Sequence, residues 1–236
     1  MNPALGSICL LAGALGLTGC QHAPAPAAAT SASVQWTDGW QPFVLPGKSA
    51  TVYTAGIADG RWALHAQSER SASMYRRALR IEPAQLGKLT FSWKVASLLA
   101  DADVRHSETD DAVVRVMLAF DGDADRLSPR TRMMFDLMHS LSGEAPPFAT
   151  LMYVWDPHAG LDSVVHNKRS DRVRKIVLET GPAQLGQWRR YERDVRADYR
   201  RAFGEDPGAL IGVAVMTDSD NTQSGAEAWY GQISFQ

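Results

Sequence analysis

Cysteine is nearly absent from this sequence: its 236 residues include two cysteines, Cys9 and Cys20, both near the N-terminus. The rest of the chain therefore has no thiol. This excludes a disulfide, a cysteine ligand for zinc and a cysteine nucleophile from everything after residue 20. The absence also suits an oxidising compartment, where an unpaired thiol would be oxidised or would pair wrongly.

Motifs of several protein classes are missing as well. None of the six histidines has the HxH or HExxH spacing of a zinc site. There is no G-x-S-x-G nucleophile elbow and no glycine-rich turn between a strand and a helix. The 24 basic and 26 acidic residues nearly balance, whereas nucleic-acid-binding domains usually have a basic excess. These absences argue against a zinc enzyme, a hydrolase with a nucleophile elbow and a nucleic-acid partner.

The N-terminus has the features of a secretory signal. Residues 4–19 are apolar or small and uncharged, which fits a signal-peptide core and is short of the about 20 residues of a membrane span. The stretch LTGC at 17–20 resembles the lipobox of bacterial lipoproteins, in which cleavage precedes a cysteine that is then acylated. The residues before this core include no Lys or Arg, which departs from the usual pattern. A buried N-terminal helix is the alternative.

This resemblance implies a location and a first partner. Residue 21 is Gln, not the Asp that usually retains proteobacterial lipoproteins in the inner membrane. We therefore expect a lipid-anchored protein of the outer membrane that faces the periplasm and contacts the membrane through acyl chains on Cys20. The Ala/Pro-rich residues that follow are typical of a tether. The expected organisation is a signal peptide at 1–19, the acylated cysteine and tether at 20–33, and one domain at 34–236.

Alternation of apolar and polar residues dominates the remainder. In LTFSWKV at 89–95 this period of two predicts a strand with one buried face. Further strands are predicted at 51–56, 61–67, 72–81, 112–120, 150–155, 172–179, 210–216 and 228–235. Short helices are predicted at 131–141, after Pro129, and at 195–203, with Asp194 as N-cap. Many strands and few helices favour an all-β, mainly antiparallel sandwich or jelly roll.

The first predicted helix has apolar residues at helical spacing. They are Met134, Leu137, Met138 and Leu141. The spacing predicts that these four side chains share one face and that this face packs on the core. A methionine stripe is a common core feature, so we do not read it as a cofactor site.

Acidic and amide side chains gather in two places. They are Asp218, Asp220 and Asn221 after the strand at 210–216, and Glu108, Asp110 and Asp111 before the strand at 112–120. Neither the stretch that starts at Asp218 nor DGDAD at 121–125 has the Gly and Glu positions of an EF-hand loop. Scattered carboxylates can still hold Ca²⁺, which makes it the candidate cofactor, whereas turn formation or the screening of a strand edge is the alternative. Two facing carboxylates could also perform the acid–base work of a glycosidase.

Aromatic residues and one arginine supply further candidates. Trp155, Trp229 and Tyr230 lie at predicted strand ends or beside turn residues, where exposed rings could stack on sugars. Packing in the core is the alternative for these rings. Arg115 lies among Val and Met in a predicted strand, so its guanidinium needs a buried acidic partner or a ligand. Asp111 or Asp218 could be that partner.

Four stretches together resemble a known family. They are LMYVWD at 151–156, GQWRRYERDVRADYRRAFGEDPG at 186–208, VAVMTDSDNT at 213–222 and AEAWYGQISF at 226–235. In this order they resemble the uncharacterised bacterial family called domain of unknown function 3047 (DUF3047), over about residues 36–235. The family has no established activity, so the resemblance implies no catalytic residue. Its ending is similar to the last strand of carbohydrate-binding jelly rolls, although Gln232 stands where Asp is expected.

Three functions stay open at this point. The strand pattern, the tryptophans and the expected anchor favour a non-catalytic binding module, with a cell-envelope glycan as the candidate ligand. The second hypothesis is an interaction protein whose partner is another envelope protein. The third is a hydrolase that uses the acidic groups near 108–111 and 218–220.

Overall fold

The computed structural model describes residue 1, residue 36 and residues 38–236. Cys20, the expected tether at 20–33 and residues 2–19 of the expected signal peptide lie outside the described residues, so the anchor stays a prediction. Within the described part of the chain, no helix is long and apolar enough to cross a membrane.

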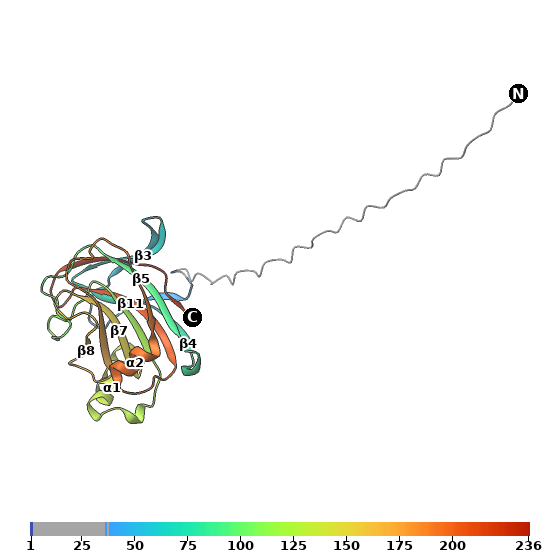
Figure 1. Cartoon of the computed structure of the whole chain (residues 1–236). Helices are drawn as coiled ribbons and strands as arrows, with labels where there is room; N and C mark the ends of the chain where they lie inside the picture. Colours follow the sequence, from blue (N-terminus) through green and yellow to red (C-terminus); the bar gives the residue numbers. More distant parts are fainter. Residues whose placement is uncertain (2–35, 37) are drawn as a thin grey trace. The chain divides into compact units, whose positions relative to one another are not determined.

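Two β-sheets form the framework and make the two layers of Figure 1. Sheet A has the strand order β1-β4-β11-β6-β7-β9-β8, and sheet B has the order β10-β5-β12-β3-β2, with β13 paired to β5. The strands are β1 Trp40–Val44, β2 Val52–Ala58, β3 Arg61–Glu69, β4 Ala72–Ile81, β5 Lys88–Val95, β6 Arg115–Phe120, β7 Ala149–Asp156, β8 Val164–His166, β9 Val173–Thr180, β10 Arg189–Asp194, β11 Leu210–Asp218, β12 Gly225–Tyr230 and β13 Ser234–Phe235. Among the described pairs, β7 with β9 is the parallel one. The predicted all-β, mainly antiparallel, jelly-roll-like sandwich is confirmed.

Helices and 3₁₀ turns interrupt the strands: α1 Pro129–Ser142, α2 Val195–Phe203, η1 Pro83–Gln85 and η2 Ala124–Arg126. Helix α1 begins after Ser128, whose side chain accepts a hydrogen bond from the Thr131 amide, and ends at Gly143 in the left-handed conformation. Helix α2 begins after Asp194, whose carboxylate accepts from the Ala197 amide at 2.9 Å. Both helices therefore have a side-chain N-cap, and that of α2 is the predicted one.

The main hydrophobic core lies between the two sheets. In β6, Val116, Leu118 and Phe120 are buried in this core, and the alternate residues point to the outer face of sheet A, away from sheet B. Trp93 of β5 is also in the core, as its alternation predicts. All residues of this core lie at or after residue 36, within the compact unit Ser33–Gln236. That unit contains its own core and is suited to study in isolation.

Candidate ligand cavity on sheet A

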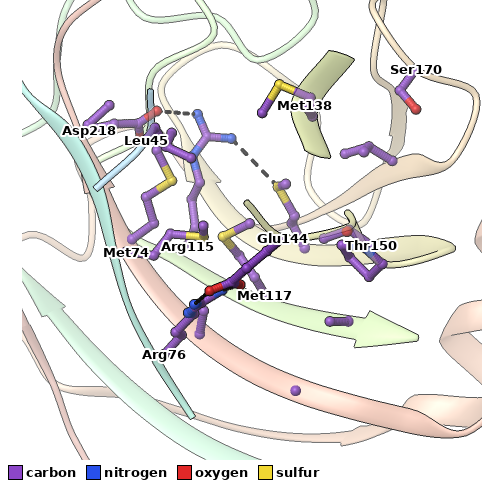
Figure 2. A pocket seen from close by; sticks show the side chains of 18 of the residues that line it. Leu45, Met74, Arg76, Arg115, Met117, Met138, Glu144, Thr150, Ser170 and Asp218 are labelled. Atoms are coloured by element: carbon purple, nitrogen blue, oxygen red, sulfur yellow. Dashed lines mark hydrogen bonds and ion pairs between the residues drawn. The ribbon is translucent and has the colours of Figure 1, made fainter. Parts of the chain in front are cut away.

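A cavity of about 780 Å³ lies against the outer face of sheet A (Figure 2). Its floor consists of the side chains on β4, β11, β6 and β7 that alternate with core residues. The register places Met74, Met216 and Arg115 in one row across three neighbouring strands. Helix α1 and the residues Glu144, Ala145 and Pro147 line the cavity as well. Its volume falls in the range of about 300–1,000 Å³ that is usual for small-molecule sites.

Methionine dominates the apolar lining. Six of the eight methionines in the chain line this cavity. They are Met74, Met117, Met152 and Met216 from four adjoining strands, and Met134 and Met138 from α1. Methionine side chains are flexible and polarisable, so such a lining adapts to the shape of a ligand. Among the described residues that line the cavity, none is aromatic.

Helix α1 adjoins the cavity but is loosely packed. Thr131 is its one buried residue among 14. Met134 and Met138 line the cavity, whereas Leu137 and Leu141 are 57% and 61% exposed. The prediction that these four side chains share one face against the core is therefore wrong. The helical spacing is real, but the stripe spans the boundary between the cavity and solvent.

Arg115 lies at the polar end of the cavity, and its guanidinium joins two carboxylates. Nε and Nη2 donate to the two carboxylate oxygens of Asp218, both at 3.0 Å. Nη2 also donates to the carbonyl oxygen of Asp110 at 2.8 Å and to its carboxylate at 3.1 Å. On the far side, Lys175 donates to the same carboxylate at 2.5 Å. The structure thus places Asp218, one of the two acids considered from the sequence, beside Arg115, and adds Asp110 and Lys175.

Burial and pairing compete in this cluster. Burial raises the pKa of Asp218 to about 6, although the Arg115 guanidinium opposes that rise. Burial alone would lower the pKa of Arg115. The attraction of the Asp218 and Asp110 carboxylates is stronger than this effect, so the pKa of Arg115 is raised. Burial would raise the pKa of Asp110, but Arg115 and Lys175 hold it below its ordinary value. The charges are therefore strongly coupled.

One end of Arg115 points into the cavity (Figure 2). Among the described residues, Nη1 has one hydrogen-bond partner, the sulfur of Met152 at 3.9 Å. Thioether sulfur is a weak acceptor. Arg115 is only 3% exposed, and a buried donor normally has a strong acceptor. Nη1 is therefore a donor that a ligand oxygen can satisfy.

Three of the acidic candidates come together. Asp111, Asp218 and Asp220 have carboxylate oxygens that lie within 4.8 Å of one another. Asp111 accepts hydrogen bonds from the Thr222 amide at 2.7 Å and from the Asn221 amide at 3.2 Å, which shapes the turn after β11. Asp220 is paired with Lys48, and Asp218 with Arg115. A Ca²⁺ ion would have to compete with these donors, so the contacts favour the turn-forming interpretation.

The remaining acidic and amide candidates lie at different depths. Glu108 is exposed, accepts a hydrogen bond from Ser107 at 2.6 Å and is not part of the cavity lining. Asn221 lines the cavity and donates from its side chain to the carbonyl oxygen of Ser107 at 2.9 Å. Asp110 lines the cavity too. The two acidic stretches of the sequence therefore meet at one end of the cavity, without Glu108.

A family model matches residues 38–234 of the chain, which is most of its length, under the description "Protein of unknown function (DUF3047)". The chain belongs to the DUF3047 family. This confirms the family resemblance seen in the four sequence stretches. No match was found among the curated proteins.

Several solved structures are similar to this DUF3047 chain at low sequence identity. One is a family 11 carbohydrate-binding module of the cellulase Lic26A-Cel5E from Clostridium thermocellum, with 9% identity, 84% of this chain and 86% of that chain covered, and a TM-score of 0.40. Another is the xyloglucanase domain of the effector NopAA from Sinorhizobium fredii, with 8% identity, 84% and 94% covered, and a TM-score of 0.42. A third is the xylan-binding module CBM86 from Roseburia intestinalis, with 14% identity, 84% and 94% covered, and a TM-score of 0.27.

The candidate sugar-stacking rings of this DUF3047 chain do not form a platform. Trp155 and Tyr230 are 1% and 0% exposed and belong to the core, so for these two rings the core-packing alternative is confirmed and the stacking hypothesis is wrong. Trp229 is half-buried on the outer face of sheet B. His65 stacks on it at 4.9 Å between ring centroids, and the Lys94 ammonium lies 4.3 Å from its centroid. Because β12 lies between β3 and β5, these two side chains cover opposite faces of the indole.

The methionine floor was missed in the sequence. Each of the strands β4, β6, β7 and β11 contributes one methionine at an outward-facing position, which alternation alone could have revealed. What the alternation does not reveal is that these four strands are neighbours, because their order in sheet A differs from their order along the chain. The floor is therefore a product of topology.

Proposed function

We propose that this DUF3047 protein is a non-catalytic binding module whose ligand occupies the cavity on the outer face of sheet A. The observation that carries the proposal is the cavity of about 780 Å³, with an adaptable apolar lining, the Arg115 charge cluster at one end and the Arg76–Glu144 ion pair elsewhere in the lining. An apolar pocket with a few convergent polar groups is the usual form of a ligand site. The expected lipid anchor at Cys20, outside the described residues, would hold the module at the outer membrane, facing the periplasm.

The pairing of the acidic side chains supports binding over hydrolysis. A glycosidase needs one carboxyl group as proton donor and a second as nucleophile or base. The carboxylates that line the cavity are Asp110, Glu144, Asp218 and Asp220. Each forms an ion pair with a basic side chain: Asp110 and Asp218 with Arg115, Glu144 with Arg76 and Asp220 with Lys48. None of the four is left to act on a substrate alone.

A blocked cavity tests the proposal. Ala214 lies on the floor in register with Arg76 of β4 and Met117 of β6, so Ala214→Trp would fill the space with an indole. Thr54→Trp on the exposed outer face of sheet B is the matched control. Residues 34–236 would be screened by thermal unfolding with peptidoglycan fragments, linear glucan oligosaccharides and C8–C16 fatty acids.

We expect compounds of at least one class to raise the unfolding midpoint of the wild type and of Thr54→Trp, and to lose this effect in Ala214→Trp. Saturation at a hundredfold excess over Kd corresponds to about 2.7 kcal/mol of added stability. If no compound of any class binds, the binding-module proposal fails. Binding that is unchanged in Ala214→Trp would place the ligand elsewhere.

A further inference from the structure

We infer that the cavity takes a straight acyl chain whose polar end has an oxygen acceptor, as in a fatty acid or the acyl group of a lipid. This inference rests on the proposed function and names the ligand class of the same cavity. Three independent features carry it: the chemistry of the lining, the weakly paired Nη1 donor of Arg115 and the apolar surface of α1.

The lining suits a flexible hydrocarbon. Its residues extend from Gln41 on β1 to Val173 on β9, across four intervening strands of sheet A. Strands lie about 4.8 Å apart, so the cavity runs across the sheet for roughly 20 Å. Between the methionines the floor has small residues, such as Ala119 and Ala214, and the Arg76 side chain, whose guanidinium is paired with Glu144. A sugar ring would find no aromatic surface among these lining residues, whereas methionines adapt to a chain.

Arg115 supplies an anchor for the polar end. Among the described residues, its Nη1 has only the Met152 sulfur as partner, although the rest of the guanidinium is fully engaged. A carbonyl or carboxylate oxygen would be a far better acceptor. Arg169, also in the lining, donates to the carbonyl oxygen of Ser107 and forms no salt bridge with any acidic side chain of the described residues. It offers a positive charge to a carboxylate head group at the same end.

Helix α1 supplies a route of entry. Beside its cavity-lining side, Met133, Leu137 and Leu141 form an exposed apolar stripe at i, i+4 and i+8, with exposures of 69%, 57% and 61%. Exposed apolar stripes on helices mark sites of contact with other proteins or with lipid surfaces, and the second fits an acyl ligand. Thr131 is the one buried residue of α1 and Phe135 packs partly buried against the core, so displacement of the helix breaks few core contacts. An acyl chain can therefore pass from a lipid surface into the cavity beneath this helix.

A chain-length series tests the inference. Residues 34–236 would be titrated calorimetrically with decanoate, dodecanoate and methyl dodecanoate, and with a peptidoglycan fragment as the non-acyl probe. Two further CH₂ groups buried in the cavity should tighten Kd roughly fifteenfold from decanoate to dodecanoate. Ala214→Trp should abolish the binding of all acyl compounds. Arg169→Gln should weaken the binding of dodecanoate and leave the binding of methyl dodecanoate unchanged, because the ester has no charge.

The outcomes separate this inference from the proposed function. Binding of dodecanoate alone points to a free fatty acid as the source, and binding of the methyl ester as well extends it to esterified lipids; either supports the inference. A Kd that does not depend on chain length overturns it, as does dodecanoate binding that survives Ala214→Trp. Binding of the peptidoglycan fragment without either acyl compound also overturns it, and leaves the binding module intact. If nothing binds, both proposals fall.

Discussion

The buried pair of Asp218 and Arg115 makes the stability of this protein depend on pH in an unusual direction. Burial raises the pKa of Asp218 to about 6, above its ordinary value of 3.8. Between these two values the folded state holds a proton that the unfolded state has released, so stability falls as pH rises. The full difference corresponds to about 3 kcal/mol, of which about 1 kcal/mol is gained between pH 7 and pH 5.

Asp218→Asn is the matched variant because it keeps the size of the side chain and removes the titration. Urea unfolding of residues 34–236, followed by tryptophan fluorescence, would give the free energy of unfolding at pH 7, 5 and 4. The wild type should gain stability relative to Asp218→Asn on acidification. If the wild type instead loses stability relative to the variant, the attraction of Arg115 outweighs burial and the reasoning is refuted.

Three further predictions concern other parts of the structure. Tyr230→Phe should lower the free energy of unfolding in urea by about 1–3 kcal/mol, because the buried hydroxyl donates to the Met216 carbonyl oxygen at 2.6 Å. An unchanged urea midpoint would show that this hydrogen bond adds nothing to stability. The midpoint of thermal unfolding should be the same in Ca²⁺ and in EDTA, because Lys48 and Arg115 are already paired with Asp220 and Asp218. A rise with Ca²⁺ that Asp220→Asn removes would support the calcium hypothesis. The amides of α1 should exchange with deuterium faster than those of α2, which buries four residues, and equal protection would contradict the loose packing of α1.

Local sequence predicted the elements well because their signals are local. The alternation at 89–95 predicted correctly which residues of β5 face the core, and Asp194 marked the start of α2. Alternation could not assign Trp229 and Tyr230, because either of two neighbouring aromatic residues can face the core. The pairing of β12 decides that Tyr230 does.

The site depended on contacts that no local pattern contains. Arg115 signalled the need for a buried acid, yet both Asp111 and Asp218 fitted that need from the sequence. The pairing of β6 with β11 sets Met216 opposite Arg115, which brings Asp218 within reach and leaves Asp111 to shape a turn. The cavity itself required the neighbouring order of four strands that are far apart in the chain.

The place of β11 also has a consequence for how the chain reaches its folded state. Strand β11 lies between β4 and β6, although it is made long after both. A chain that grows from its N-terminus therefore has two unpaired strand edges until Leu210–Asp218 arrives and joins them. Such edges are prone to pair with other molecules, and long-range pairing is slow. Release from the ribosome before this strand would yield an aggregation-prone fragment, so the floor of the cavity can close only late in synthesis, when β12 and β13 alone are still to be made.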